Sequence, residues 1–168
     1  EREIILVTEN IISNAIFYED VNPEDITIRT RSHPTGHCSS TGDPHLTTFD
    51  GYYYHFYGRG YVKMVDNENL EIQAITHGGR YSRNCAVAVR EFNDLVIIDV
   101  CDGSLEITER ITTIGDNRPT IYSRGSNQYI VEFSSGTQVQ AHTWGNNMNI
   151  YIDIPGNYRG NVDGMCGN

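Results

Sequence analysis

Apolar and polar residues alternate over short stretches along most of this chain, and Gly, Asn and Asp residues separate the stretches. In the clearest stretch, residues 70–76, Leu70, Ile72 and Ala74 are separated by single residues. A period of two is typical of half-buried β-strands. Comparable runs predict strands at residues 4–7, 15–18, 26–29, 52–57, 61–65, 86–89, 95–100, 129–133, 139–142 and 149–154. Many short strands and no capped helical period predict an all-β fold, either a sandwich or a barrel.

Two places punctuate this β pattern. Asp102-Gly103 is a typical hairpin signal between β-prone runs. Residues 32–36, Ser-His-Pro-Thr-Gly, interrupt the pattern and predict a boundary. We therefore expect an N-terminal segment at residues 1–35 and a main domain at 36–168. The first segment is either the tail of a preceding β domain or a set of strands that pack onto the main domain.

The charge balance limits the partners. The 168 residues hold 22 acidic and 12 basic side chains, a net charge of −10. An acidic chain is repelled by nucleic acid and by anionic membranes, so we expect neither as a partner. No apolar run approaches the roughly 20 residues that a membrane-spanning helix needs, so we expect no membrane insertion. The same charge suits calcium or a basic partner.

Four cysteines, with no Cys-x-x-Cys pair, argue for disulfides rather than a zinc knuckle. Disulfides persist in oxidising compartments, so we expect an extracellular, secreted protein. Four cysteines allow three pairings, and the residues alone leave them open. The chain begins with Glu1 without a signal peptide and ends at Asn168 within a motif, so we expect a processed or truncated piece of a longer protein.

Specific motifs lie in the main domain. Residues 42–45 read Gly-Asp-Pro-His, residues 48–51 read Thr-Phe-Asp-Gly, and residues 166–168 read Cys-Gly-Asn. In this combination the chain resembles a von Willebrand factor type D domain over about residues 36–168. Residues 34–38, 61–64 and 97–101 make it similar in particular to the D domain of von Willebrand factor D and EGF-like domain-containing proteins. The resemblance implies a disulfide-stapled, β-sandwich-like extracellular module.

The resemblance also implies how the cysteines pair. Carried over to this chain, the family pattern joins Cys38 to Cys166, which leaves Cys85 with Cys101. Many members have a further cysteine where this chain has Asp163. The vicinal cysteines needed for an oxidoreductase-like role in multimer assembly are therefore absent, and we do not expect that role here.

Calcium is a further implication of the resemblance. Calcium takes six to eight oxygen ligands from carboxylates, amides and carbonyls. The family places Asp50 near Asn168, with more ligands downstream of the chain's end. We therefore expect a calcium site that this chain supplies only in part. The alternative is that Asp50 holds a turn before Gly51 through its side chain.

The bond between Asp43 and Pro44 is chemically labile, and in some D domains Gly-Asp-Pro-His resembles a self-cleaving site. The Asp43 carboxylate can attack its own carbonyl carbon, and the basic proline nitrogen leaves readily. His45 is placed to transfer the proton, because histidines commonly act as general acids and bases. The alternative is a rigid turn in which Pro44 fixes φ. After cleavage, a Cys38–Cys166 bond would hold the two pieces together until reduction.

An aromatic block at residues 52–57 is the remaining candidate site. Alternate residues of a strand face opposite sides, so Tyr53, His55 and Tyr57 share one face. We expect the other face to enter the core and this one to form a tyrosine-rich contact patch. Ordinary strand packing is the alternative.

These observations favour a structural and adhesive function. No nucleophile elbow, phosphate-binding loop or His-Glu-x-x-His motif occurs, and we expect no enzyme activity on an external substrate. We expect a module of a secreted multidomain protein that contributes to matrix or filament assembly. Its partners would be other extracellular modules or copies of its parent protein. The alternatives are a self-processing module that cleaves at Asp43-Pro44 and a binding module for a secreted signalling protein.

Overall fold

The computed structural model describes residues 2–6, 26–30 and 35–167. It divides the chain into two compact units, Glu1–His33 and Pro34–Asn168. In the first unit, β1 (Arg2–Leu6) pairs antiparallel with β2 (Ile26–Thr30), in a register that opposes Arg2 to Thr30 and Leu6 to Ile26. The predicted strand at residues 15–18 lies outside the described residues.

The second unit is built from twelve strands joined in one hydrogen-bonded sheet. In chain order they are β3 (Gly36–Thr41), β4 (His45–Thr47), β5 (Tyr53–His55), β6 (Gly60–Asp66), β7 (Leu70–Gly78), β8 (Ser82–Glu91), β9 (Asp94–Asp99), β10 (Glu106–Arg110), β11 (Thr120–Arg124), β12 (Gln128–Glu132), β13 (Gln138–Trp144) and β14 (Asn147–Ile154). A 3-10 turn, η1 (Gly115–Asn117), connects β10 to β11. Within the described ranges, no helix is long and apolar enough to cross a membrane.

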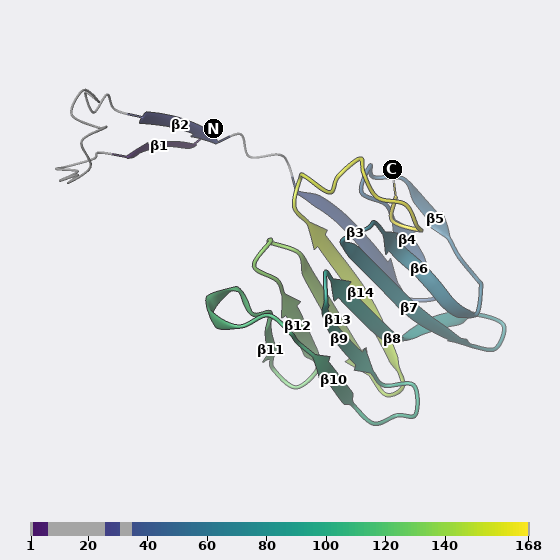
Figure 1. Cartoon of the computed structure of the whole chain (residues 1–168). Coiled ribbons are helices and arrows are strands. Elements are labelled where there is room, and N and C mark those ends of the chain that lie inside the picture. Colours follow the sequence, from purple (N-terminus) through teal and green to yellow (C-terminus); the bar gives the residue numbers. More distant parts are fainter. Residues whose placement is uncertain (1, 7–25, 31–34, 168) are drawn as a thin grey trace, which may run out of the picture. The chain divides into compact units, whose positions relative to one another are not determined.

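The sheet folds onto itself as two layers (Figure 1). One layer is the run β6 to β10, and the other has the order β5-β4-β3-β14-β13-β12-β11. The two layers are connected through a single residue pair, Asn84 with Met148, between β8 and β14, which are inner strands of their layers. Buried side chains from both layers form one hydrophobic core, which confirms the predicted all-β, sandwich-like fold.

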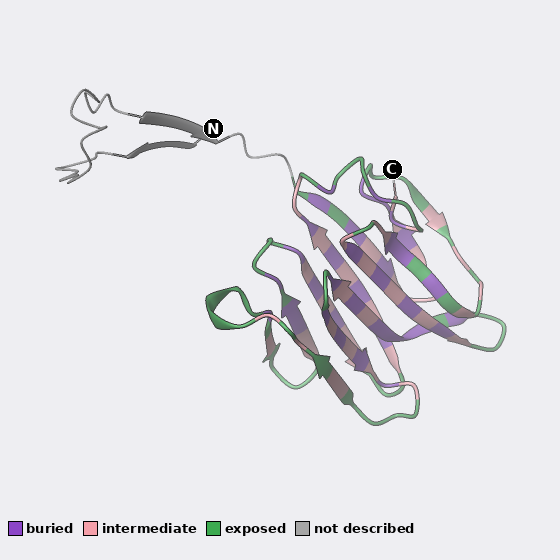
Figure 2. Cartoon of the chain, viewed as in Figure 1, coloured by how far each residue is buried: buried purple, intermediate pink, exposed green. Residues whose placement is uncertain are grey.

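Alternation along the strands builds this core. On β7, Leu70, Ile72 and Ala74 are buried and their neighbours are only half-buried, as the pattern predicts. On β14, Ile150 and Ile152 are fully buried. Figure 2 shows the same alternation of buried and less buried positions along the central strands. Each fully buried Leu or Ile contributes roughly 1.5–3 kcal/mol relative to an exposed one. The core therefore fixes which face of each strand points inward.

Two disulfides staple the second unit: Cys38–Cys166, with Cα atoms 5.7 Å apart, and Cys85–Cys101, with Cα atoms 4.7 Å apart. This is the pairing that the family resemblance implies. The first bond spans 128 residues of chain and the second spans 16. In the chain-entropy account, the two bonds stabilise the fold by roughly 5 and roughly 3 kcal/mol.

Four strands carry no clear sequence signal. They are β3, β4, β10 and β11. The inward positions of β3 are Gly36, Cys38 and Ser40, which are small rather than apolar. β4 has one buried side chain, Leu46. β10 and β11 are the last strands at the two ends of the main hydrogen-bonded path, where no fully buried position is present on either strand.

The aromatic block is also shorter than predicted as a strand. Only Tyr53–His55 is in β5, against the expected residues 52–57. Tyr54 and Phe56 pack against the core, but Tyr52 on the same predicted face is 67% exposed. Tyr52 lies in the turn that precedes β5, where its backbone N–H and carbonyl both bond Thr48. The turn therefore takes Tyr52 out of the alternation.

Candidate functional site

The Gly-Asp-Pro-His sequence forms the tight turn between β3 and β4, which Thr41 and His45 close as a cross-strand pair. Gly42 has a φ of +65°, a conformation that favours glycine. Its N–H donates to Asn149 Oδ1 at 2.9 Å, and the Pro44 carbonyl accepts from the Phe56 N–H at 3.1 Å. The turn is therefore anchored to β14 on one side and to the end of β5 on the other.

His45 lies between two partners in this turn. Its Nε2 is 3.3 Å from Asp43 Oδ1, and its Nδ1 is 2.7 Å from His55 Nδ1 on β5. One of the two Nδ1 atoms must donate and the other accept. When His55 donates, a neutral His45 carries its proton on Nε2, the atom that faces Asp43. The arrangement can therefore hold a transferable proton next to the Asp43 carboxylate.

Asp50 lies in the turn that follows β4. Its carboxylate accepts from Thr48 Oγ1, and Gly51 continues the turn with a φ of +84°. The bond from Thr48 is the main reason that the pKa of Asp50 lies below its ordinary value. The Phe49 N–H donates to the Cys166 carbonyl at 3.1 Å, so this turn and the C-terminal segment are neighbours.

The C-terminal segment is itself docked on β6. Asp163 and Asp66 exchange backbone hydrogen bonds of 2.8 and 2.9 Å. Cys166 N–H donates to the Met64 carbonyl at 2.8 Å. Gly164 has a φ of +104°, and a Cβ there would lie 2.7 Å from the Met64 oxygen. Only glycine therefore allows the backbone to approach β6 closely enough to present Cys166 to Cys38.

Within the described residues, no group of three His, Cys, Asp or Glu side chains converges as a metal site. Asp50 is the one predicted calcium ligand that the structure describes, because Asn168 lies outside the described residues. The described part of the chain thus supplies one carboxylate at the Asp50 turn.

An exposed row of rings runs along the β5 edge, and we call it the aromatic ladder: Tyr53, His55, Tyr57 and Tyr81. Successive ring centroids are 5.3, 6.1 and 6.3 Å apart. The three tyrosines are between 51% and 54% exposed. The ladder thus presents four neighbouring rings at one edge of the sheet. Tyr81 joins the ladder from the turn between β7 and β8.

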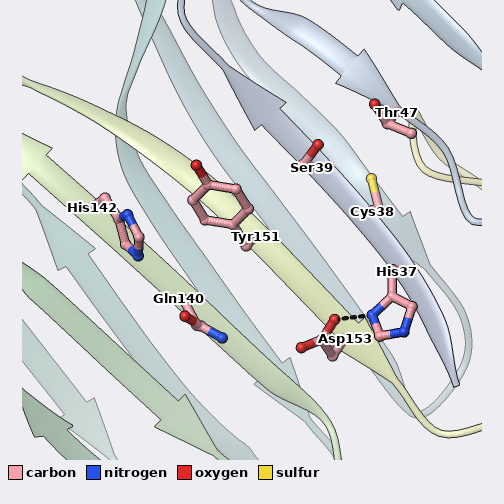
Figure 3. A pocket seen from close by; sticks show the side chains of 8 residues that line it. All are labelled: His37, Cys38, Ser39, Thr47, Gln140, His142, Tyr151 and Asp153. Carbon is pink, nitrogen blue, oxygen red and sulfur yellow. Dashed lines mark hydrogen bonds and ion pairs between the residues drawn. The ribbon is translucent and has the colours of Figure 1, made fainter. Parts of the chain in front are cut away.

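A shallow pocket lies on the outer face of β3, β13 and β14 (Figure 3). His37 Nδ1 and Asp153 Oδ1 are 2.5 Å apart at one end, and Tyr151 stands over the middle strand. His142 packs against the Tyr151 ring, with centroids 4.8 Å apart, and its buried Nε2 has no partner among the described residues. This pocket offers mostly neutral hydrogen-bonding groups.

A buried carboxylate, Glu91, has a structural role. Its oxygens accept from Ser135 Oγ at 2.8 and 2.9 Å, from Thr137 Oγ1 at 2.9 Å and from the Tyr158 hydroxyl at 3.3 Å. Burial, together with the nearby Glu91 charge and this hydrogen bond, raises the pKa of Tyr158 to about 12. Glu91 therefore ties the end of β8 to the loops that follow β12 and β14.

The structure brings some predicted site residues together and separates others. Asp43 meets His45, and His45 meets His55, which sequence analysis assigned to a different site. Asn149 and Tyr81 were not predicted. Asn149 lies 107 residues from Gly42 in sequence. Strand pairing brings Asn149 to Gly42 and Tyr81 to Tyr57, so no local motif signals either contact.

These features define an all-β domain in which a disulfide joins β3, the strand before the Gly-Asp-Pro-His turn, to the C-terminal segment. A family model described as the von Willebrand factor type D domain matches residues 38–168. The chain therefore belongs to the von Willebrand factor type D domain family. The narrower similarity to von Willebrand factor D and EGF-like domain-containing proteins stays a prediction.

Similar regions occur in large curated proteins. The chain is 31% identical over 142 residues to Mucin-2 of Rattus norvegicus, covering 78% of this chain and 9% of that protein. It is 31% identical over 144 residues to Mucin-2 of Homo sapiens, covering 79% of this chain and 3% of that protein. Hemocytin of Bombyx mori is 27% identical over 150 residues, or 83% of this chain and 4% of that protein. The chain thus spans less than a tenth of the length of these relatives.

Proposed function

We propose that this domain is an extracellular structural and adhesive module of a larger secreted multidomain protein, and that it contributes to matrix or filament assembly. Two disulfides and no free cysteine among the described residues suit an oxidising compartment. The relatives contain the matching region as a small part of long chains. The proposal assigns no turnover of an external substrate.

The aromatic ladder is the observation that carries the adhesive role. Its rings are exposed on a frame that two disulfides hold rigid. Tyrosine gives a large contact area at a low cost in side-chain entropy, because it has few rotatable bonds. A rigid surface loses little further freedom on association. We assign this surface to contacts with other extracellular modules or with copies of the parent protein.

Sedimentation equilibrium over a range of concentrations tests the role. We expect the domain to form concentration-dependent oligomers and the Tyr53→Ser/Tyr57→Ser variant to remain monomeric. Tyr61→Ser/Ile114→Ser is the matched control, because both residues are highly exposed and lie outside the ladder. A monomer at every concentration, or equal loss in the control, would refute the proposed role of the ladder in assembly.

Calcium is proposed as a stabiliser of this module, held by Asp50 and Asn168 with ligands from beyond the chain. The exposed Asp50 carboxylate supports it, because carboxylate oxygens are the ligands that calcium prefers. The test is a chain extended past Asn168, melted in calcium and in chelator. We expect calcium to raise the melting temperature, and Asp50→Asn to remove the increase. An equal increase in the variant would exclude Asp50 as a ligand.

Self-processing at Asp43-Pro44 is a second candidate function, favoured by the 3.3 Å approach of His45 Nε2 to Asp43 Oδ1. In this reaction an Asp43 carboxylate oxygen attacks the Asp43 carbonyl carbon, and the bond to the Pro44 nitrogen breaks. A protonated His45 delivers its Nε2 proton to that nitrogen and is left as a neutral imidazole. Asp43 is left as a cyclic anhydride, which water opens to the free acid. His55 acts as a positioning residue, because its Nδ1 accepts the Nδ1 proton of His45 and so holds the Nε2–H of His45 toward Asp43.

Intact mass after incubation at pH 5 and reduction tests this candidate. Self-processing predicts two fragments that divide between Asp43 and Pro44, and none in Asp43→Asn. His55→Gln should slow the reaction, whereas His37→Gln, which changes an exposed histidine elsewhere, should not. A chain that stays whole at pH 5 removes self-processing from the account and leaves the structural role standing.

A further inference from the structure

A second pocket lies beside the aromatic ladder, where two turns meet. His77, Gly78, Gly79, Arg80, Tyr81 and Arg83 line it from the turn between β7 and β8, and Asn146 and Asn147 line it from the turn between β13 and β14. The pocket has a volume of about 410 Å³. Tyr81 belongs both to this pocket and to the ladder. Pocket and ladder therefore form one continuous surface.

The charge of this pocket is opposite to that of the chain. Its lining holds two guanidinium groups and an imidazole and, among the described residues, no acidic side chain. His77 and Arg83 are cross-strand partners in the β7–β8 register, and both side chains line the pocket. Within the described part of the chain, neither Arg80 nor Arg83 has a carboxylate within 4.0 Å, whereas Arg90 and Arg118 do. In a chain of net charge −10, such unpaired cations favour an anionic ligand.

Further groups around the pocket indicate what else a ligand could contact. Arg59 donates to the Gly79 carbonyl and brings a third guanidinium to the pocket's rim. His77 Nε2 and Asn147 Oδ1 are 3.3 Å apart, which fixes two groups that can bond hydroxyls. Arg80 lies 5.7 Å from the Tyr81 ring centroid. Beyond Tyr81, the rings of Tyr57 and His55 continue at spacings comparable to the length of one pyranose unit.

We propose that this pocket and the ladder bind an acidic saccharide, with sulfate or carboxylate groups at Arg80 and Arg83 and sugar rings on Tyr81 and Tyr57. Guanidinium groups bind such anions through paired, charge-assisted hydrogen bonds. The exposed tyrosines beside these cations can contact the apolar parts of a sugar while the guanidinium groups bind its acidic groups. The inference rests on the proposed extracellular role, because it names a partner class for that adhesive surface.

Titration calorimetry with a heparin-derived hexasaccharide tests the proposal. We expect binding that weakens with salt, and a loss of at least about tenfold in affinity for Arg80→Gln/Arg83→Gln. Arg110→Gln/Arg124→Gln is the matched control, because it removes the same charge from two exposed arginines that have no carboxylate within 4.0 Å among the described residues. No binding by the wild-type domain, or equal losses in the two variants, overturns the site.

A polyglutamate peptide of the same charge separates the two kinds of partner. We expect it to bind more weakly than the hexasaccharide, and Tyr81→Leu to weaken only the saccharide. Tighter binding of polyglutamate assigns the pocket to an acidic polypeptide and overturns the saccharide proposal. Sedimentation of Arg80→Gln/Arg83→Gln, run in parallel, keeps this result separate from the assembly role, because that role does not require the two arginines.

Discussion

The two disulfides lie in regions that are built in different ways. Cys38–Cys166 joins β3 to a C-terminal segment that is 128 residues away, and Cys85–Cys101 joins β8 to the residue two positions after β9. In the first region the segment has no regular strand of its own and depends on backbone bonds to β6. In the second, β8 and β9 already pair over six residue pairs. The first bond closes the domain, and the second reinforces a hairpin that strand pairing also holds.

This difference matters for function because the family motifs lie in the first region. The Gly-Asp-Pro-His turn extends from β3, and the Asp50 turn bonds Cys166. Loss of the closure would free the C-terminal segment and its bond to the Asp50 turn, whereas the bonds to Asn149 and Phe56 would still hold the Gly-Asp-Pro-His turn. The second region contributes stability away from these motifs.

Removing each disulfide tests the comparison most strongly. We expect Cys38→Ser/Cys166→Ser to lose about 5 kcal/mol of unfolding free energy and Cys85→Ser/Cys101→Ser about 3 kcal/mol. The larger loss follows from the longer loop that the first bond closes. Urea unfolding measures both values. Equal losses in the two variants would contradict the difference in roles.

Two glycines, one in each disulfide region, test how closely the backbone is packed there. Gly164→Ala should cost about 1–2 kcal/mol for its positive φ and about 1–3 kcal/mol more for the overlap with Met64. Gly103→Ala is the matched control in the second region, because Gly103 has a φ of +91° but no atom within 4 Å of the added Cβ. We expect it to lose only about 1–2 kcal/mol. Thermal melts of the two variants measure the difference, and an equal shift would argue against tight docking of the C-terminal segment.

Acid unfolding tests one carboxylate in each disulfide region: Asp94 at the start of β9, and Asp50 in the turn that bonds Cys166. Burial raises the pKa of Asp94, but bonds from Thr113 and Thr112 outweigh it, so the pKa lies below its ordinary value. A lowered pKa gives stability that is present above the unfolded value of about 4 and is lost as the pH falls through the folded value. We expect Asp94→Asn to lower the free energy of unfolding by about 2 kcal/mol at pH 7. The variant should also lose less of its remaining stability as the pH falls.

Asp50 is the control for the acid measurement. Its pKa is also lowered, chiefly by Thr48, but the side chain is exposed. In calcium-free buffer, Asp50→Asn should therefore change the loss of unfolding free energy at low pH far less than Asp94→Asn does. Urea midpoints between pH 3 and pH 7 measure both variants. A larger effect at Asp50 would contradict the assignment of Asp94 as the structural carboxylate.

The central strands were predictable because burial leaves a period-two pattern in their sequences. Residues 70–76 lie within β7, and residues 149–154 lie within β14. The hairpin at Asp102-Gly103 is also present, with Gly103 N–H bonded to the Val100 carbonyl at 2.9 Å. β3 escaped prediction because Cys38 and Ser40 face inward in place of larger apolar residues. A small inward side chain leaves no hydrophobic signal.

The candidate sites were predictable only where one motif contains all their members. Asp43 and His45 belong to one turn, and the sequence pairs them. The contact of His45 with His55 depends on the β4–β5 register. The pocket at Arg80 and Arg83 needs Asn146 and Asn147 from a distant turn. Long-range pairing creates such sites, and a single sequence does not encode that pairing in any local pattern.

Intact mass at neutral pH, with and without reductant, tests the central claim of a disulfide-closed, whole scaffold. Two disulfides predict one species that is lighter by four hydrogens before reduction than after it. Peptide mapping should join Cys38 to Cys166 and Cys85 to Cys101. A mass with free thiols before reduction, or a different pairing, would contradict the closure on which the proposed extracellular role depends.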